Sequence, residues 1–557
     1  MPVKTFEKNL FLRDYDSKCK FCGNCAIISF MENSKLLPLG VQDFCNLREG
    51  NYIYADKSAL VYELTHSNRA VFLSRPRRFG KSLLLSTIKY YFLGRKDLFA
   101  GLAIEKLESK EQWGEHPVFY FSLASGTYSE KIGLKDKIKN ALATIEKEYE
   151  LPVQNPETTL SVRFENDLRA AYEKTGRKVV VLVDEYDKPL LETMSVNEEQ
   201  EKLNRIIYKE YWSTLKDCDE YLQFYMFTGV TKFSKVSIFS DLNQLNDISL
   251  NEQFDSICGI TQTELELNFA TEIENLAKRY GMSKEKCLVE LKKRYDGYHF
   301  TSKLENLYNP FSLLSAFSNN KFGNYWFETG TPTFLVNRLC EINFDVRKFD
   351  DNVKISESEI KDYHPESDNP VPLLYQSGYL TIKSWNQRQE SYKLGFPNEE
   401  VKYAFLNALA PGYLKIEKNT SQFNIDVLDD AVEEGDTDGM RDWFTSIFAL
   451  LPYPTGSDTD SVTEQNFQNV IFLTLTMMGK YARTEVHSAK GRADCVLETD
   501  DYVYIFEFKR DVPAIEALKQ IDEQGYAAPY SADSRKLFKI GVNFSTSERN
   551  ISEWVVR

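Results

Sequence analysis

The chain has 557 residues, of which 42% are hydrophobic and 27% are charged, and its formal net charge is −15. This length predicts about three domains, the composition is that of a soluble globular protein, and an acidic chain is not expected to coat nucleic acid indiscriminately. The sequence shows neither a run of about eighteen apolar residues nor a basic segment followed by an apolar one at its start, which predicts a cytoplasmic protein without a membrane span.

The first segment of the chain contains three cysteines with the spacing C-x-x-C-x-x-C, at Cys19, Cys22 and Cys25. This spacing can ligate zinc or part of an iron–sulfur cluster. A fourth ligand is missing nearby, with Cys45 the next candidate, so a flexible extension with incidental thiols is the alternative. The nine cysteines of the chain are an odd number, which favours reduced thiols over a disulfide framework.

The first motif with a clear chemical meaning is a short apolar strand, a tight loop and a helix start, in which Gly80, Lys81 and Ser82 complete a phosphate-binding pattern. The glycine lets the backbone turn, the lysine reaches the β- and γ-phosphates of a nucleotide, and the serine hydroxyl ligates Mg²⁺. Arg75 stands where the pattern has its first glycine, and we expect the arginines of the loop to supply positive charge near the phosphates. An ordinary strand-to-helix turn with a solvated basic face is the alternative. The predicted nucleotide contacts in this loop are Arg78, Phe79, Gly80, Lys81, Ser82 and Leu83.

A second motif is the β-branched run that ends at Asp184, which is typical of a central parallel strand. Asp184 would hold Mg²⁺ through water, and Glu185 would polarise the water that attacks the γ-phosphate. A later apolar strand ends at Thr228, which we expect beside Asp184, where it would sense the γ-phosphate. An ordinary strand-end hydroxyl is an equal alternative. Lys232 or Lys235 is a candidate for neutralising charge at this site.

Apolar strands and helical stretches alternate before residue 260, which predicts a parallel sheet with helices on both faces. The next two hundred residues or so read as mostly helical, with aromatic islands that we interpret as core. Two strands near Tyr379 and Tyr392 suggest a small winged-helix-like element. The acidic stretch from Asp426 to Asp460 predicts a linker.

A strand near the C-terminus alternates in a way that places Glu507 and Lys509 on one face, and Asp494 lies on the neighbouring strand of the same hairpin. Two carboxylates and a lysine at this spacing predict a metal-dependent phosphodiesterase. Asp494 and Glu507 would bind Mg²⁺, and Lys509 would position the attacking water or stabilise the pentavalent charge. Glu464 is the candidate for a third metal-binding carboxylate, and Gln520 for orienting the water or a phosphate oxygen. A surface hairpin with solvated charges is the alternative.

From about residue 36 to its end, the chain resembles the bacterial AAA-ATPase-like family, whose members join an N-terminal P-loop module to a C-terminal PD-(D/E)XK nuclease-like domain. The motifs that carry the resemblance are Arg75–Ser82, Val183–Asp187, Thr228–Ser234, Tyr295–Phe300, Gly491–Asp494 and Glu507–Lys509. It implies nucleotide contacts at Lys81 and Ser82 and a Walker B pair at Asp184 and Glu185. It also implies nuclease-type roles for Asp494, Glu507 and Lys509, and it makes the missing P-loop glycine a feature of the family.

The fold class that we expect is α/β: a P-loop NTPase parallel sheet with helices on both faces, a mostly helical middle region and a C-terminal α/β PD-(D/E)XK nuclease-like domain. The expected boundaries are 1–35 for an extension with the cysteines, 36–260 for the ATPase-like domain, 261–455 for the middle region and 456–557 for the nuclease-like domain.

The expected function is that of an ATPase with ATP and Mg²⁺ as cofactors, fused to a nuclease that cleaves DNA under ATP control and acts in defence against foreign DNA. We expect nucleic acid as the partner, no membrane, and an assembly of identical copies as one arrangement open to the chain. The alternative function is a nucleotide-switched scaffold or sensor whose nuclease-like domain binds nucleic acid or protein without cutting.

Overall fold

The computed structural model describes the chain from residue 35 to its end, apart from short internal segments. The segments outside the description are 1–34, 109–112, 131–132, 156, 195–196, 233–244, 327–334, 337–338, 341, 343, 350–352, 362–368, 415–424, 451–463, 478–480, 488–491 and 549. The side chains of 410, 411, 414, 425, 426, 450, 464–468, 476, 477, 481–487 and 492 also lie outside it. The hypotheses on Cys19, Cys22, Cys25 and Lys235 therefore fall outside the described residues.

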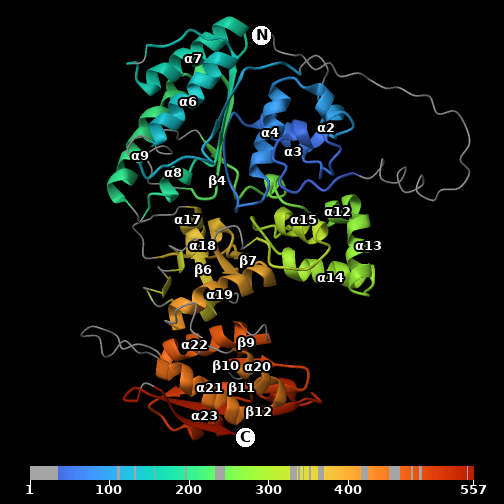
Figure 1. The fold of residues 1–557 in the computed structure, drawn as a ribbon, viewed down its shortest axis with the longest axis vertical. Helices are drawn as coiled ribbons and strands as arrows, with labels where there is room; N and C mark the ends of the chain where they lie inside the picture. Colours follow the sequence, from blue (N-terminus) through green and yellow to red (C-terminus); the bar gives the residue numbers. More distant parts are fainter. Residues whose placement is uncertain are drawn as a thin grey trace, which may run out of the picture.

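The molecule is a stack of modules (Figure 1). A parallel sheet with helices on both sides lies at one end, a helical group and a small sheet lie in the middle, and a larger sheet with its own helices lies at the other end. This arrangement confirms the predicted α/β class with a helical middle region. Within the described part of the chain, no helix combines the length and the apolar character that a membrane crossing requires.

The first sheet is built from five parallel strands in the order β2-β3-β4-β1-β5. Its strands are β1 (Ala70–Ser74), β2 (Val118–Ser122), β3 (Val179–Asp184), β4 (Leu222–Gly229) and β5 (Asn246–Asp247). Every residue of β3 is buried, as a central strand covered on both faces requires. Because β4 lies between β1 and β3, three strands deliver their C-terminal ends to one edge of the sheet.

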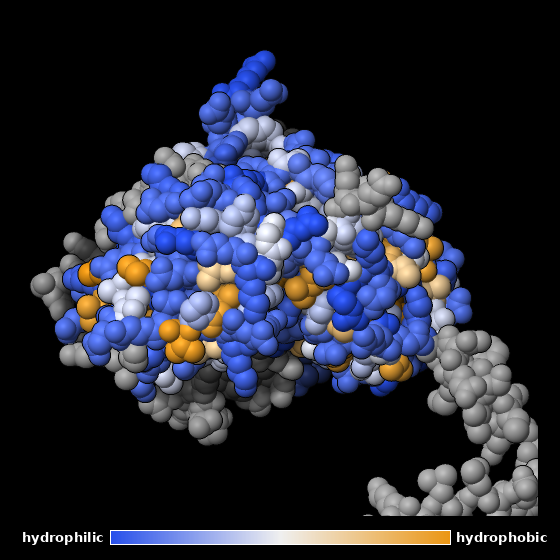
Figure 2. Space-filling model, turned by 90° about the horizontal axis from the view of Figure 1, so that it is seen from above, coloured by the Kyte–Doolittle hydropathy of each residue, from blue (hydrophilic) through white to orange (hydrophobic). Residues whose placement is uncertain are grey.

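Helices cover both faces of this sheet, with α6, α7 and α9 on one side and α2, α3 and α4 on the other (Figure 1). The helices of the module are α2 (Phe44–Glu49), α3 (Ser58–Ser67), α4 (Lys81–Phe92), η1 (Lys96–Phe99), α5 (Ile104–Leu107), α6 (Gly133–Glu148), α7 (Leu160–Thr175), α8 (Lys188–Leu191), α9 (Glu198–Trp212), α10 (Thr214–Asp217) and η2 (Asp219–Tyr221). Figure 2 looks onto this end of the molecule, and that face is mostly hydrophilic with small scattered apolar groups. Such a surface is typical of a face in contact with water.

The middle region contains two parts. A helical group with its own hydrophobic core consists of α12 (Gln262–Asn268), α13 (Ala270–Arg279), α14 (Lys284–Tyr295) and α15 (Pro310–Ser318), and η3 (Glu252–Phe254) precedes it in the chain. The second part is an antiparallel sheet in the order β6-β8-β7 with its helices. Its elements are η5 (Val346–Phe349), β6 (Val353–Ser356), α17 (Glu357–Lys361), α18 (Val371–Ser377), β7 (Thr381–Asn386), β8 (Ser391–Gly395) and α19 (Glu399–Leu414).

The C-terminal module is a sheet in the order β13-β12-β11-β10-β9, in which β11 and β12 run parallel and the other neighbours antiparallel. Its elements are α20 (Ile425–Glu434), α21 (Thr437–Leu450), α22 (Glu464–Met477), β9 (Tyr481–His487), β10 (Arg492–Glu498), β11 (Tyr502–Arg510), α23 (Ala514–Glu523), η6 (Ala528–Tyr530), β12 (Lys536–Ser545) and β13 (Asn550–Val556). α19 of the middle region packs against α22, which in turn contacts β9, β10 and β11.

The prediction of a linker from Asp426 to Asp460 was wrong for its described part, which forms α20 and α21. These helices pack on the C-terminal sheet, where the Tyr504 hydroxyl donates to the carbonyl of Val432 at 2.6 Å. The acidic side chains concealed an amphipathic pattern, because Leu428 and Val432 are buried while charged neighbours face water.

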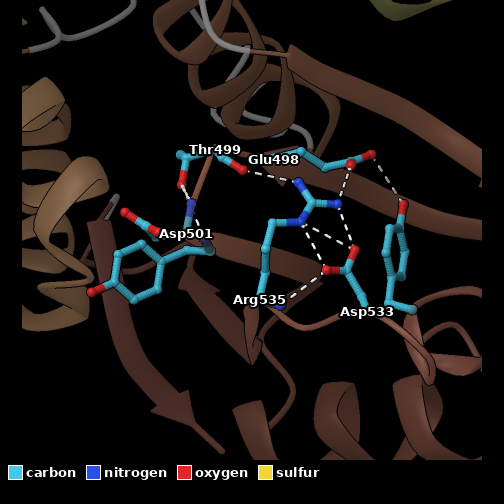
Figure 3. Close-up of polar contacts among 7 residues, drawn as sticks. Glu498, Thr499, Asp501, Asp533 and Arg535 are labelled. Carbon is cyan, nitrogen blue, oxygen red and sulfur yellow. Dashed lines mark hydrogen bonds and ion pairs between the residues drawn. The ribbon is translucent and has the colours of Figure 1, made fainter.

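A charged cluster holds one end of this sheet together (Figure 3). Arg535 donates to Glu498 at 2.8 Å, to the carbonyl of Thr499 at 2.9 Å and to Asp533 at 2.6 Å. The Thr499 hydroxyl accepts from the backbone N–H of Asp501 within the β10–β11 turn. The cluster therefore ties the hairpin to the segment before β12.

Candidate active sites

The loop between β1 and α4 has the geometry of a phosphate-binding loop. Gly80 is the N-cap of α4 with a φ of +91°, a conformation that side chains with a Cβ rarely adopt. The Lys81 ammonium group is buried and donates to the carbonyls of Arg75 and Pro76, both at 2.9 Å. Burial lowers the pKa of Lys81, while the carboxylate of Asp184 opposes this shift. A phosphate at this position would restore the interactions that the ammonium group loses by leaving water.

Arg75 does not face the phosphate position, so our expectation that it adds charge there was wrong. Its side chain is 1% exposed, and its guanidinium donates to the carbonyl of Ser249 at 2.8 Å and lies 4.2 Å from the ring centre of Phe300. The side chain that replaces the first glycine therefore points away from the phosphate position and links the loop to the segments of Ser249 and Phe300. Burial lowers the pKa of this guanidinium as well.

Aromatic side chains of the middle region enclose the outer side of the loop. The ring of Phe79 is buried against Tyr298 at 4.7 Å and Phe300 at 5.3 Å, so only its backbone is available to a nucleotide. Trp326 donates from its indole N–H to the carbonyl of Arg77 at 3.1 Å. The aromatic islands are thus structural, as we interpreted them, and they hold the loop.

Gly378, the C-cap of α18, also lies against the loop. It has a φ of +89°, and a Cβ placed on it would be 2.6 Å from Cβ of Pro76. Two residues earlier, at the end of the same helix, Gln376 accepts through Oε1 from the backbone N–H of Lys232 at 3.1 Å. α18 is therefore in contact with both the phosphate loop and the segment after β4.

The carboxylate of Asp184 lies at the end of β3, where the sequence placed it. Its Oδ1 accepts from the Thr228 hydroxyl at 2.9 Å, and its Oδ2 accepts from the Tyr120 hydroxyl at 3.4 Å. Thr228 is fully buried behind this carboxylate, so it orients Asp184, and any influence on a phosphate would run through that group. The expected proximity of the two residues is confirmed.

Glu185 follows with a φ of +51°, an uncommon conformation for a glutamate. Burial and the neighbouring Asp184 raise the pKa of its carboxyl group. Asp187 completes the motif in a structural role: its Oδ2 accepts from the backbone N–H groups of Val230 and Thr231 at 2.9 and 2.7 Å. The motif thus fixes the segment after β4 while it leaves Glu185 facing the cavity.

Lys232 does not have the role that we considered for it. Its ammonium group pairs with Asp247 at 2.8 Å, and the residue lines a small hollow beside Arg75 rather than the cavity of Lys81 and Asp184. The positive groups that line the larger cavity include Arg78, Lys89 and Lys188. The sequence motif did not point to the two lysines, because they lie outside the loop pattern.

This larger cavity has a volume of about 760 Å³, a size suited to a nucleotide-sized ligand. Ser82, Asp184 and Glu185 line it together with Lys81. Part of its apolar lining comes from two distant segments of the chain, Pro38–Val41 and the start of α15. These two segments contribute Pro38, Leu39, Val41, Pro310, Phe311 and Leu314 to the cavity wall. Phe311 also lies 4.8 Å below the guanidinium of Arg78, a contact that no sequence motif indicated.

The second site is built on the β10–β11 hairpin. The strand register pairs Cys495 with Phe506, which places Asp494 and Glu507 at the next opposite positions. Asp494 Oδ2 accepts from the backbone N–H of Phe508 at 2.9 Å, and Lys509 donates to Glu507 Oε1 at 3.0 Å. The sequence predicted this convergence of two carboxylates and a lysine, and the structure brings the three together.

Glu507 lies in an environment that is unusual for a carboxylate. It is 1% exposed, and its Oε2 finds no hydrogen-bond partner within the described residues. Burial, and secondarily the charge of Asp494, raise its pKa to about 7, while Lys509 opposes the shift. A buried, unpartnered carboxylate oxygen next to a second carboxylate fits a divalent cation, which prefers such hard oxygen ligands.

The remaining candidates are less well placed. Glu464 begins α22, but its side chain lies outside the described residues. Gln520 lies on α23, which packs on β11, and its amide donates to the Tyr526 hydroxyl at 3.3 Å. Within the described part of the chain, no three His, Cys, Asp or Glu residues form a metal-binding group, so Asp494 and Glu507 are a pair there.

Each of the two candidate sites lies in a part of the chain that matches a known protein family. A family model described as a predicted AAA-ATPase matches residues 38–239, and a model of the PD-(D/E)XK nuclease superfamily matches residues 462–554. A curated relative, "Uncharacterized protein in vnfD 5'region" of Azotobacter chroococcum mcd 1, is 35% identical over 537 residues, or 94% of this chain and 99% of the relative.

Among solved structures, the ORC2 protein of Aeropyrum pernix, described in ADPNP–ADP complexes, has 11% identity and a TM-score of 0.23. The match covers 68% of this chain and 97% of the other. At that score the two chains do not superpose closely enough for their sites to be compared.

Proposed function

Since the chain belongs to the family of predicted AAA-ATPases with a C-terminal PD-(D/E)XK nuclease superfamily domain, we propose that it binds and hydrolyses ATP at the first site and cleaves DNA at the second. The observation that carries the nuclease half is the buried, unpartnered oxygen of Glu507 beside Asp494 and Lys509. It gives a divalent cation a place next to a positive group that can meet a phosphate.

In the nucleotide cavity, the roles follow from position. Lys81 would contact the β- and γ-phosphates, and backbone N–H groups between Arg78 and Leu83 would donate to them. Ser82 and Asp184 would hold Mg²⁺, which, when bound, neutralises phosphate charge. Glu185, whose carboxyl pKa is raised, accepts a proton from the attacking water more readily than an ordinary glutamate.

In the nuclease site, Asp494 and Glu507 would hold Mg²⁺, with Glu464 as the third carboxylate, and the cation when bound would activate water and polarise the scissile phosphate. Lys509 then stabilises the charge that develops on the phosphorus oxygens. Gln520 would orient a phosphate oxygen once its amide leaves the Tyr526 hydroxyl.

ATP control has a physical route through the middle region. Trp326 and Gly378 contact the phosphate loop, and α18 leads through β7 and β8 into α19. α19 packs against α22, the helix on which Glu464 lies. We propose that these packed elements carry a change in the loop on nucleotide binding to the nuclease module.

The test is digestion of plasmid, linear and single-stranded DNA by the full chain with Mg²⁺, with and without ATP. We expect cleavage that needs Mg²⁺, loss of cleavage with Asp494→Ala, and loss of ATP binding and of the ATP response with Lys81→Ala. Lys139→Ala, an exposed lysine on α6, is the matched control and keeps both activities. ATP-dependent binding of DNA without cleavage would instead support the scaffold or sensor.

The biological role that we propose is defence against foreign DNA within the cytoplasm. Cells that express the chain should then restrict phage or plasmid entry, and cells with Asp494→Ala should not. Assembly into several copies is tested by light scattering with ATP, because ATPases of this kind can complete their sites with an arginine from a neighbour. Equal numbers of phage plaques or plasmid transformants in cells with the unchanged chain and in cells with Asp494→Ala would refute the defence role.

A further inference from the structure

The outward face of the small β6-β8-β7 sheet carries positive charge. Lys354 on β6 lies directly opposite Lys393 on β8, and both side chains are exposed. Inward-facing residues of the same strands, Ile355 and Leu394, are buried in the core. The two lysines therefore belong to the solvent face by register, and their position is fixed by the packing beneath them.

Two like charges directly opposite each other in a sheet destabilise it unless another group compensates for them. Lys354 and Lys393 form no ion pair with any described residue, and neither does Arg388 in the turn that joins β7 to β8. On β7, the uncharged Ser384 lies opposite Lys393, and the uncharged Asn386 lies opposite Ser391. A local basic face on a chain of net charge −15 thus lacks an internal counter-charge.

Three carboxylates lie on segments next to this face, and none of them forms an ion pair with Lys354, Arg388 or Lys393. Glu359 accepts from the Ser356 hydroxyl at 2.6 Å at the end of β6. Glu357 pairs with Lys361. Glu390 is exposed at the last position of the β7–β8 turn, with a φ of +44°. The face itself keeps its positive charge.

The face is hollowed. A depression of about 460 Å³ lies between the strands and the β7–β8 turn. Its lining is basic, amide and hydroxyl in character: Lys354, Ser384, Asn386, Gln387, Arg388, Gln389, Ser391 and Lys393, with Trp385 at its side. Ammonium, guanidinium and amide groups are the donors that proteins use to hold phosphate oxygens.

The helix next to this sheet is not open to a ligand. Residues Val371 to Gln376 of α18 are all buried, and Gly378 at its end contacts the phosphate loop. The surface that a ligand can reach is therefore the face of the small sheet with its β7–β8 turn, and not α18.

We propose that this basic sheet face, formed by Lys354, Arg388 and Lys393, binds the phosphate backbone of duplex DNA. Choosing DNA over another polyanion rests on the proposed nuclease function. The lysines and the arginine contact phosphates without reading bases, so binding there is independent of sequence. The face is a second contact for DNA, in the middle region rather than on the nuclease hairpin.

The experiment measures binding of a short fluorescent DNA duplex to the full chain in EDTA, where no cleavage occurs, over a range of salt concentrations. The double variant Lys354→Ala/Lys393→Ala should bind at least roughly tenfold more weakly at about 0.1 M salt. The slope of log affinity against log salt should fall by about 1 to 2, because one or two phosphate contacts are lost. Lys354→Arg/Lys393→Arg should keep both values.

The matched control is Lys135→Ala/Lys139→Ala, which removes two exposed lysines one helical turn apart on α6. It should bind DNA as the unchanged chain does. Equal affinity and equal salt slope for the Lys354 and Lys393 variant would overturn the proposal, and so would binding of that face to anionic lipid vesicles in place of DNA.

The outcome is separable from that of the proposed nuclease activity. If Asp494→Ala abolishes cleavage while the sheet variant binds normally, the nuclease stands and the basic face does not bind DNA. If the sheet variant loses binding while Asp494→Ala still cuts, the basic face stands and the nuclease assignment fails. A sheet variant that cuts with a raised KM and an unchanged kcat supports both.

Discussion

The two candidate active sites are assembled in opposite ways. The nucleotide cavity gathers groups from segments as distant as Pro38 and Phe311, and aromatic side chains of the middle region hold its loop. The nuclease pair comes from one hairpin, where the register alone sets Asp494 opposite Glu507. The first site therefore depends on how modules pack, and the second depends on local strand pairing.

The two sites are nevertheless alike in electrostatics. Each holds a buried charged group whose pKa is shifted toward the neutral form: lowered for Lys81 and raised for Glu507. In both cases burial is the largest cause. Each group gains most from a ligand of opposite charge, an anion at the loop and a cation at the hairpin.

The largest expected effect comes from a substitution that inactivates the hairpin site alone. Glu507→Gln removes the charge that a cation needs and keeps the shape, so Mg²⁺-dependent cleavage should fall roughly a thousandfold. ATP hydrolysis in the absence of DNA should be unchanged, because the cavity of Lys81 is built elsewhere. Glu516→Gln, an exposed position on α23, serves as the control and keeps full cleavage. Equal loss of both activities in Glu507→Gln would show that the two sites are not independent.

A change of pH should expose the charge of Glu507. Its folded-state pKa of about 7 lies above that of an unfolded glutamate, about 4.3. Between these two pKa values, the folded chain keeps a proton on Glu507 that the unfolded chain has lost. The free energy of unfolding therefore falls as the pH rises through that window. Mg²⁺ competes with this proton, so its affinity should drop about tenfold per pH unit below 7.

Titration calorimetry with Mg²⁺ at several pH values measures this dependence. The increase in the thermal midpoint on adding Mg²⁺ should be larger at pH 8 than at pH 6. Glu507→Gln should remove the pH dependence. An affinity that is flat across this range would place the cation away from Glu507.

A smaller effect should weaken the nucleotide cavity alone. Gly378→Ala brings a Cβ within 2.6 Å of Pro76, which displaces the phosphate loop, and we expect ATP affinity to fall about tenfold, or about 1.4 kcal/mol. Gly176→Ala is the matched control: this glycine also has a positive φ, +65°, but a Cβ there meets nothing within 4 Å. Both variants carry the backbone strain of about 1 kcal/mol, so a loss of ATP affinity in both would attribute the effect to strain and not to the loop contact.

The contrast between the sites also explains what the sequence could predict. The alternation of Glu507 and Lys509 on a strand, with Asp494 one strand away, is a local pattern, and the structure brings these groups together. The parallel sheet and the neighbourhood of Asp184 and Thr228 follow likewise from strand ends at one edge.

What the sequence could not predict depends on long-range packing. No local pattern shows that the Arg75 side chain turns toward Phe300, or that Phe311 reaches the nucleotide cavity. The same limit made Asp426–Asp460 read as a linker, because its acidic residues drew attention away from the buried apolar ones that pack on the C-terminal module. Composition measures average polarity, whereas a helix needs only one apolar face.

The smallest expected effect concerns a buried charge that neither site uses. Asp167 on α7 is fully buried next to Glu146, which is bound to Arg163 at 2.6 Å. Burial, and then the charge of Glu146, raise the pKa of Asp167 to about 7. As this value lies above that of an unfolded aspartate, the free energy of unfolding falls as pH rises toward 7, where the carboxylate must charge.

Asp167→Asn removes this loss of stability and keeps the size and shape of the side chain. We expect the gain of the variant to be about 1 to 2 kcal/mol larger at pH 8 than at pH 5, where only part of the loss has developed, seen as a pH-dependent rise in the thermal midpoint of the ATPase module. Asp136→Asn, an exposed aspartate on α6, should shift neither value. A gain of equal size at both pH values would mean that packing, rather than charge, limits stability at α7. The ATP and cleavage activities should stay unchanged, because Asp167 lines neither site.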